Sequence, residues 1–166
     1  HLGIEGADVI NHSFGGRVSI LLASRFPELV GRIVFTDAAG VLPKRGLRYK
    51  LRVGWYKVKK KVALSRLGRA VCRLFGVDVE ARMKSAGSED YRALQTDVMR
   101  QTFVRVVNED LTPYLKDIKA SSLLIFGSED TATPVAMGQV MEREIVDSAL
   151  IVLDGAGHYS YLDQFG

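Results

Sequence analysis

The strongest constraint on the fold of this chain is a serine in a turn of small residues between an apolar run and a helical pattern. Residues 7–10 form a short apolar run that is typical of a buried strand, and residues 17–26 have the composition of a helix. A serine at such a strand-to-helix turn is held in a strained conformation with its hydroxyl exposed. The first N–H groups of the helix point to the same place and suit a developing oxyanion. Ser13 is therefore a candidate nucleophile.

Strand and helix patterns alternate along much of the chain. Residues 32–35 are a second apolar run, and strand–helix–strand within about 30 residues indicates a βαβ unit in a parallel sheet. After a connection at residues 108–119, two more strands are predicted at 122–126 and 149–153, with a helix at 135–145 between them. The pattern predicts an α/β protein with a parallel sheet of about four strands and flanking helices.

A strongly basic stretch separates the two strand-containing parts. From Lys44 to Arg73 there are twelve Lys or Arg and no Asp or Glu, which leaves 11 basic against 19 acidic residues, a net −8, in the rest of the chain. Interleaved apolar residues predict amphipathic helices here, and residues 89–107 predict a further helix capped by Ser88. The basic face is either solvated or a surface for an anionic membrane or acidic partner. Without a binding motif, basicity does not predict nucleic-acid binding.

Three side chains with complementary chemistry follow predicted strands. Acyl transfer by serine needs a nucleophile, a base that takes its proton and an acid that orients the base. Asp130 follows one strand in Gly-x-x-Asp-x-x-x-Pro, and His158 follows the next in Gly-x-Gly-His. An open parallel sheet binds its ligands at the carboxyl ends of its strands. Ser13, Asp130 and His158 are thus predicted to meet at one edge of the sheet.

Each of these residues alone also fits a plain structural role. Ser13 could form a tight turn, Asp130 could cap the following helix, and His158 could lie on the surface. Asp37 also follows a strand and is an alternative acid. His12 is expected to pack or hydrogen-bond beside the site. Three further carboxylates are expected to be solvated: Glu129, Asp154 and Asp163.

The turn at Ser13 and the order serine, acid, histidine resemble the nucleophile elbow and triad of the α/β-hydrolase superfamily. The elbow there is normally Gly-x-Ser-x-Gly, and this chain has Asn11 in place of the first glycine. A side chain at that position should crowd the neighbouring backbone, so Asn11→Gly is expected to be neutral or stabilising. The resemblance implies Ser13 as nucleophile, Asp130 as acid and His158 as base.

The same resemblance implies how the oxyanion would be bound. The backbone N–H of Phe14 supplies one donor, helped by Gly15, and the second comes from a loop that would precede His1. The chain begins at His1 rather than Met, and we interpret it as a piece of a longer protein.

The layout resembles the later half of the α/β-hydrolase fold with a cap inserted. We predict a first core part at residues 1–40 with the nucleophile elbow, a helical basic cap at 41–112, and a second core part at 113–166 with the acid and histidine loops.

Composition narrows the remaining function classes. Cys72 is the single cysteine, which excludes an internal disulfide and predicts a reducing, cytoplasmic location. No apolar run has the roughly 18–20 residues of a membrane span. Three scattered histidines and one cysteine lack metal-ligand spacing, so no metal and no cofactor are predicted.

The predicted function is a serine hydrolase that cleaves a small ester-like substrate through an acyl-enzyme. Peptidase, thioesterase, carbon–carbon bond hydrolase and acyltransferase activities stay open, as does the oligomeric state. The rival hypothesis is a non-catalytic fragment or a binding module that uses the basic lid at an anionic membrane or partner surface.

Overall fold

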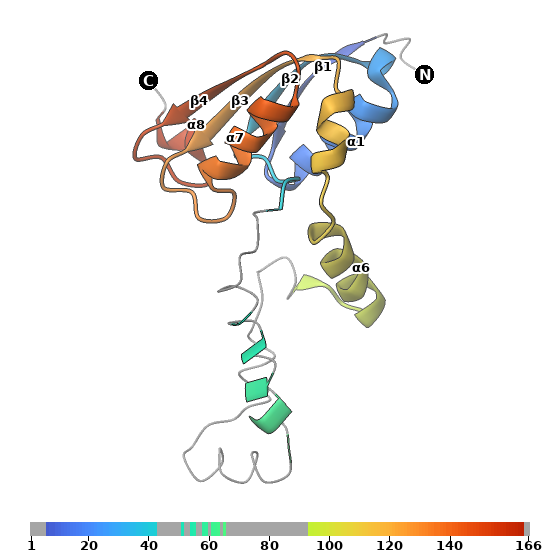
Figure 1. The fold of residues 1–166 in the computed structure, drawn as a ribbon, viewed down its shortest axis with the longest axis vertical. Helices are drawn as coiled ribbons and strands as arrows, with labels where there is room; N and C mark the ends of the chain where they lie inside the picture. Colours follow the sequence, from blue (N-terminus) through green and yellow to red (C-terminus); the bar gives the residue numbers. More distant parts are fainter. Residues whose placement is uncertain are drawn as a thin grey trace. The chain divides into compact units, whose positions relative to one another are not determined.

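The computed structural model describes residues 6–42, 51, 54–55, 58–59, 61–63, 65 and 93–164 (Figure 1). The chain divides into two compact units. The first unit comprises His1–Pro43 and Asn108–Gly166, and the second comprises Lys44–Val107. The predicted cap, 41–112, is longer than the second unit at both ends, and two of its predicted residues, Val41 and Leu111, are buried in the core of the first unit. The assignment of a cap function to this region stays a prediction.

The first unit is built on a parallel four-stranded sheet in the order β1-β2-β3-β4. The strands are β1 Ala7–His12, β2 Val30–Thr36, β3 Ser121–Gly127 and β4 Ser148–Leu153. The predicted fold class is confirmed: all four predicted strands form, and their carboxyl ends reach the same edge. Each strand extends past its apolar run, because polar residues at strand ends also join the ladder, as His12 opposite Thr36 does.

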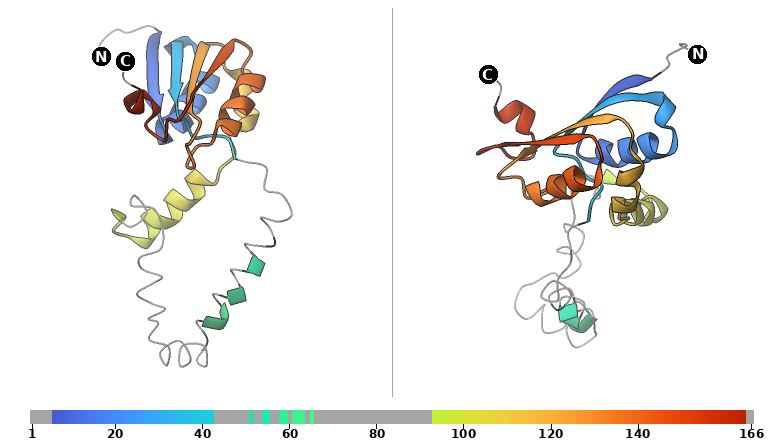
Figure 2. Two further views of the ribbon diagram at one scale, coloured as in Figure 1. Left: turned by 90° about the vertical axis from the view of Figure 1, so that its left-hand side faces the viewer. Right: turned by 45° about the horizontal axis from the view of Figure 1, so that its top comes forward.

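Two helices, α1 Phe14–Arg25 and α7 Val135–Glu144, cover the same face of the sheet (Figure 2). The 3-10 helix η2, Thr112–Asp117, packs against both. The short elements η1 Pro27–Leu29 and α8 Ser160–Asp163 complete the unit. This layered arrangement buries one apolar face of the sheet and leaves the carboxyl ends of the strands free for the loops that follow them.

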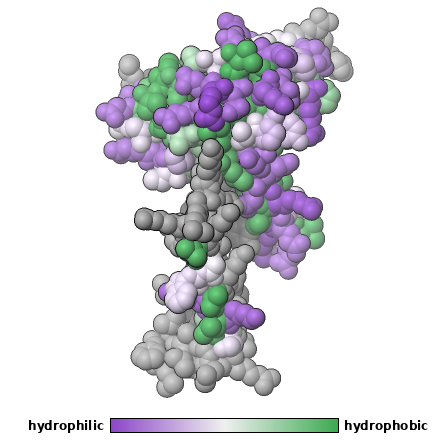
Figure 3. All heavy atoms as spheres, in the orientation of Figure 1, coloured by the Kyte–Doolittle hydropathy of each residue, from purple (hydrophilic) through white to green (hydrophobic). Residues whose placement is uncertain are grey.

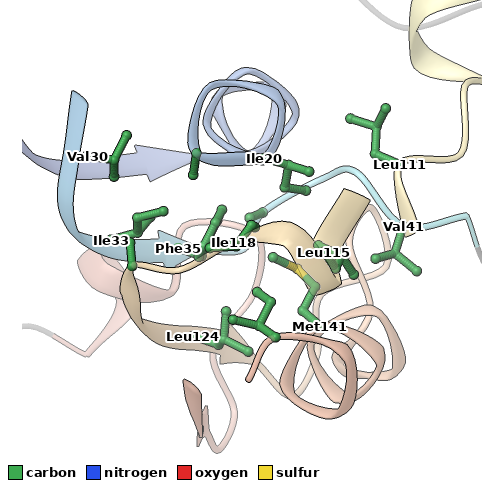
Figure 4. Close-up of a cluster of buried hydrophobic side chains, with 14 of the residues drawn as sticks. Ile20, Val30, Ile33, Phe35, Val41, Leu111, Leu115, Ile118, Leu124 and Met141 are labelled. Carbon is green, nitrogen blue, oxygen red and sulfur yellow. The ribbon is translucent and has the colours of Figure 1, made fainter. Parts of the chain in front are cut away.

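The core lies between the sheet and these helices (Figure 4). Its fully buried members come from the sheet (Ile33, Phe35, Leu124 and Phe126), from α1 (Ile20) and from α7 (Met141). Residues 108–119 were predicted as a simple connection, but Leu111, Leu115 and Ile118 are at most 1% exposed. This segment is therefore part of the core, because its apolar residues recur every three to four positions and lie on one side of η2.

The turn that carries Ser13 is tighter than the sequence indicated. The helix was predicted to begin at Arg17, but α1 begins at Phe14, directly after Ser13. Gly15 and Gly16, which suggest a turn, lie inside the helix. A Cβ on Gly16 would come within 2.7 Å of both Ala38 Cβ and the Ala39 carbonyl oxygen, so this glycine allows α1 to pack closely against the chain that follows β2.

The segments at 40–42 and 109–112 are joined within the first unit. Leu111 N–H donates to the Gly40 carbonyl at 2.9 Å. The Asp110 carboxylate accepts hydrogen bonds from Leu42 N–H at 3.4 Å and from Thr112 Oγ1 at 2.6 Å. Arg17, buried in α1, donates to the Glu109 carbonyl. The two segments are thus fixed to α1.

In the second unit the structure describes α6, Asp97–Val107. The helix was predicted from residue 89. Residues 89–92 and Ser88 lie outside the described residues, and 94–96 are not helical. Thr96 Oγ1 accepts a hydrogen bond from Met99 N–H at 3.2 Å, which is the geometry of an N-cap and accounts for the later start.

Much of the predicted basic stretch lies outside the described residues. Those that are described between 51 and 63 are helical, as predicted: Leu51, Gly54, Trp55, Val58, Lys59, Lys61, Val62 and Ala63. Figure 3 shows apolar residues scattered over a largely polar surface. Among the residues just named, Leu51, Trp55, Val58 and Val62 have exposed side chains. Among the described helices none combines the length and the apolar character needed to cross a bilayer.

Candidate active site

Ser13 lies between the end of β1 and the first residue of α1. Its backbone has φ 50° and ψ −116°, a positive φ that is unusual for a residue with a side chain. The Ser13 carbonyl accepts hydrogen bonds from Gly16 N–H at 3.0 Å and Ala39 N–H at 2.8 Å, and Ser13 N–H donates to the Thr36 carbonyl at 3.3 Å. These bonds hold the strained turn and leave the serine hydroxyl free for other partners.

The hydroxyl of Ser13 lies beside the imidazole of His158. Ser13 Oγ and His158 Nε2 are 3.0 Å apart, and His158 Nδ1 lies 2.8 Å from Asp130 Oδ2. A carboxylate only accepts hydrogen bonds, so Nδ1 carries a proton, and the tautomer with Nδ1–H presents the lone pair of Nε2 to the hydroxyl. The three residues, 145 positions apart at the extremes, form one hydrogen-bonded chain. Such a chain can deprotonate a serine during attack on a carbonyl.

Asp130 is held as a carboxylate by its loop. The residue is 5% exposed. Burial alone would raise the pKa of Asp130, but hydrogen bonds from the Thr133 hydroxyl, from His158 and from the N–H groups of Thr133 and Ala132 outweigh it and keep the pKa below its usual value. The two backbone bonds to Oδ1 measure 3.0 and 2.7 Å. The acid can therefore orient His158 as an anion.

Thr133 takes part in this network, although the sequence did not single it out. Its Oγ1 lies 2.5 Å from Asp130 Oδ2, 2.9 Å from the Asp37 carbonyl and 3.3 Å from His158 Nδ1. The only available signal was its place three residues after Asp130, where a hydroxyl can bond back to the loop. Thr133 fixes the rotamer of the carboxylate that faces the histidine.

Asp37, the alternative acid, has other partners. Its Oδ1 accepts from Gly127 N–H at 2.9 Å, and its Oδ2 accepts from Ser160 N–H at 3.0 Å and Ser160 Oγ at 2.6 Å. The carboxylate bonded to His158 Nδ1 is that of Asp130. The geometry thus favours Asp130 as the orienting acid and gives Asp37 a different role.

Phe14 occupies the position that the resemblance assigns to an oxyanion donor. It is the first residue of α1, and the N–H groups of the first helical turn have no acceptor within the helix. Its N–H follows directly after Ser13, where the helix dipole also favours negative charge. The role of Phe14 stays a prediction that this position supports.

Three rings pack around His12, one of them the imidazole of His158. The His12 ring lies 4.9 Å from that of His158 and 5.0 Å from that of Tyr159, and Tyr161 is 5.4 Å from His12 between centroids. His12 Nδ1 is 3.1 Å from the Thr36 carbonyl, which makes it the protonated nitrogen. His12 therefore both packs and hydrogen-bonds beside the site, as expected from the sequence.

The three carboxylates that were expected to be solvated are exposed. Two of them also hold loops. Asp154 accepts from Ser128 Oγ at 3.2 Å, and Asp163 Oδ2 accepts from Gly157 N–H at 2.8 Å, next to His158. Glu129 contributes its backbone N–H to the Ala156 carbonyl at 2.9 Å. In the described part of the chain, His, Cys, Asp and Glu form no group of three that could hold a metal ion.

Asn11 replaces the first glycine of the usual elbow and is 8% exposed. A Cβ on Gly15 would lie 3.3 Å from Asn11 Cβ, so the space that the Asn side chain occupies is provided by the glycine four residues later. Neither polar atom of the Asn11 amide has a hydrogen-bond partner among the described residues.

Fold and site geometry together define the class of protein: a parallel α/β sheet with a serine at a strand-to-helix turn and a histidine–aspartate pair on later strand ends. The chain belongs to the alpha/beta hydrolase fold family, whose profile matches residues 1–165.

Two curated relatives and one solved structure illustrate the similarity. An uncharacterized hydrolase, YugF, of Bacillus subtilis is 26% identical over 95% of this chain and 60% of its own length. A 2-hydroxymuconate semialdehyde hydrolase of Pseudomonas putida is 26% identical over 98% of this chain and 59% of its own. The meta-cleavage product hydrolase CumD of Pseudomonas fluorescens shares the fold, with a TM-score of 0.60 at 21% identity over 98% of this chain and 61% of that one. The chain thus spans about 60% of the length of the relatives it matches.

Proposed function

We propose that the protein is a serine hydrolase in which Ser13, His158 and Asp130 act as nucleophile, base and orienting acid on a small ester-like substrate. The single observation that carries the proposal is the unbroken chain of contacts, 3.0 Å from Ser13 Oγ to His158 Nε2 and 2.8 Å from His158 Nδ1 to Asp130 Oδ2. The family membership supports it, because the curated relatives are named as hydrolases.

The reaction has two steps, acylation of Ser13 and hydrolysis of the acyl-enzyme. Ser13 Oγ forms a bond to the substrate carbonyl carbon while its proton passes to His158 Nε2, and the negative charge moves to the carbonyl oxygen, beside Phe14 N–H. The oxyanion then re-forms the carbonyl, and the leaving alkoxide departs with the proton from His158. Water next attacks the acyl-enzyme, His158 takes its proton, and Ser13 leaves with that proton. Asp130 stabilises the imidazolium in both steps.

The substrate class has a second candidate. Three relatives are named as hydrolases of 2-hydroxymuconate semialdehyde, of 2-hydroxy-6-oxo-2,4-heptadienoate and of 2-hydroxy-6-oxo-6-phenylhexa-2,4-dienoate. These names make hydrolysis of a carbon–carbon bond next to a carbonyl the second activity to test. A substrate panel of p-nitrophenyl acetate, p-nitrophenyl butyrate and 2-hydroxy-6-oxo-6-phenylhexa-2,4-dienoate distinguishes the two activities. An esterase turns over the two p-nitrophenyl esters faster, and a carbon–carbon bond hydrolase turns over the dienoate faster.

The proposal is tested by labelling the full-length protein with a fluorophosphonate probe. Ser13 Oγ forms the bond to phosphorus, fluoride leaves, and the hydroxyl proton passes to His158. We expect labelling of wild type at Ser13 and none of Ser13→Ala. An unlabelled wild-type protein that is folded by circular dichroism would refute the hydrolase and leave the rival, a non-catalytic binding module.

A further inference from the structure

Asp37 is a buried carboxylate at the carboxyl end of β2 that the proposed reaction does not use. It is fully buried, and its backbone has φ 45°, in the left-handed region. A buried carboxylate costs several kcal/mol unless hydrogen bonds compensate, and a left-handed residue with a side chain costs roughly 1–2 kcal/mol more. Aspartate and asparagine are the side chains best tolerated there. Two such costs at one residue beside the site point to a role in the site itself.

The side chain of Asp37 holds the histidine loop. Oδ2 accepts hydrogen bonds from Ser160 N–H at 3.0 Å and from Ser160 Oγ at 2.6 Å. Ser160 is two residues after His158, is fully buried and begins α8. The carboxylate therefore fixes the chain immediately after the imidazole that must face the serine.

Asp37 also holds both sides of the acid loop. Its Oδ1 accepts from Gly127 N–H at 2.9 Å, and its carbonyl lies 2.9 Å from Thr133 Oγ1, whose one proton it shares with Asp130 Oδ2. Gly127 is three residues before Asp130, and Thr133 is three residues after it. The residue directly after β2 thus contacts the loops that follow β3 and β4.

We propose that Asp37 is a positioning residue that sets the distance between the acid loop and the histidine loop. The proposal rests on the proposed function, because it assigns to Asp37 the alignment of His158 with Asp130 and Ser13. Asp130 and His158 come from different strands, and no covalent link keeps them at 2.8 Å. A misplacement of about 1 Å in such an arrangement can lower a rate about 100-fold.

The test variant is Asp37→Asn in the full-length protein. Asparagine tolerates the left-handed backbone and keeps the volume, but in either orientation of its amide the NH₂ group would face a backbone donor, Gly127 N–H or Ser160 N–H, so that two donors meet. We expect the rate constant of fluorophosphonate labelling at Ser13 to fall about 10- to 100-fold, while the final labelled fraction stays that of wild type. Ser160→Ala, which removes only one of the bonds, should lower it less.

The control variant is Asp8→Asn, which removes an exposed carboxylate at the opposite end of the sheet, where Asp8 pairs with Arg32 at 2.6 Å. It should label at the wild-type rate. If Asp37→Asn lowers the melting temperature but labels each site at the wild-type rate, Asp37 is only a scaffold residue and the proposal is wrong.

A second measurement does not need turnover. The Nδ1–H proton of His158, bonded to a carboxylate, should give a downfield proton resonance in wild type that shifts or disappears in Asp37→Asn and persists in Asp8→Asn. If wild type shows no labelling yet this resonance depends on Asp37, the hydrolase proposal fails and the positioning proposal stands. If the resonance is the same in both variants and wild type, the positioning proposal is overturned.

Discussion

Asp130 is the residue whose protonation links the site to the stability of the fold. Its pKa is below the usual value in the folded chain, because hydrogen bonds outweigh the effect of burial, and returns to about 3.9 when the chain unfolds. A lowered folded pKa means that the charged form stabilises the fold above the unfolded value, and that this contribution is lost as the pH falls through the folded value.

We therefore predict a pH-dependent difference between wild type and Asp130→Asn. The excess unfolding free energy of wild type should be constant above about pH 5 and shrink as the pH falls below about 4. Urea unfolding at a series of pH values measures it, with Glu129→Gln, which removes the exposed neighbouring carboxylate, as the matched control. A difference that is independent of pH between 2 and 6 would contradict the prediction.

The sequence could predict the three side chains that meet in the candidate site, but not those that support them. Ser13, Asp130 and His158 stand out because each has reactive chemistry and follows a strand. Asp37 acts through backbone atoms and a hydroxyl of Gly127 and Ser160, which lie 90 and 123 positions away, and Thr133 reaches the Asp37 carbonyl across 96 positions besides bonding to Asp130 nearby. Such partners have no local pattern, because they depend on which strand ends become neighbours in the sheet.

Among the elements, the close contact between β3 and the histidine loop is the most demanding. A Cβ on Gly127 would lie 2.3 Å from the carbonyl oxygens of Ala156 and Gly157, immediately before His158. Backbone oxygens cannot rotate away as a side chain can, so the loop would have to move. Because Gly127 has no side chain, the end of β3 can pack directly against the backbone of the histidine loop.

We predict that Gly127→Ala lowers the unfolding free energy by about 1–3 kcal/mol and the labelling rate of Ser13 by about 10- to 100-fold. The matched control is Gly155→Ala in the histidine loop that Gly127 contacts. Its Cβ would meet nothing within 4 Å, but φ is 72°, so we expect roughly 1–2 kcal/mol of backbone strain and little change in rate. Equal labelling rates for the two variants would show that the contact does not position His158.

The presence of a helix or strand could be predicted where one of its faces is apolar, but the residues at which it begins and ends could be predicted less well. The strand β3 is one residue longer than predicted at each end, and α7 ends one residue earlier than predicted. The start of α1 was misplaced by three residues, because Gly15 and Gly16 look like turn residues and only the packing against Ala38 shows why they are helical. Leu111 and Leu115 were missed as core because a short 3-10 helix leaves too few apolar positions for a recognisable period.

At the scale of the whole molecule, charge is divided unevenly between the two units. The twelve basic residues of 44–73 lie in the second unit, whereas the rest of the chain is net acidic. Among the described residues of this stretch, four apolar side chains at helical spacing are more than half exposed: Leu51, Trp55, Val58 and Val62. Lys59 Nζ lies 5.4 Å above the Trp55 ring. Basic residues beside an exposed apolar row are typical of helices that lie on anionic bilayers.

We predict that the protein binds anionic phosphatidylserine vesicles at low salt, because each Lys or Arg near such a surface contributes about 1 kcal/mol to binding. The protein should be released as the ionic strength rises, because salt shortens the range of this electrostatic attraction to about 8 Å at 0.15 M. Neutral phosphatidylcholine vesicles should not bind it.

Two double variants change the net charge equally. Lys59→Glu/Lys61→Glu lies in the second unit, and Lys116→Glu/Lys119→Glu lies in the first. If the basic stretch is the contact, co-sedimentation falls much further in the first variant. An equal loss in both would assign the binding to net charge alone, and salt-independent or absent binding would leave the basic face without a membrane partner.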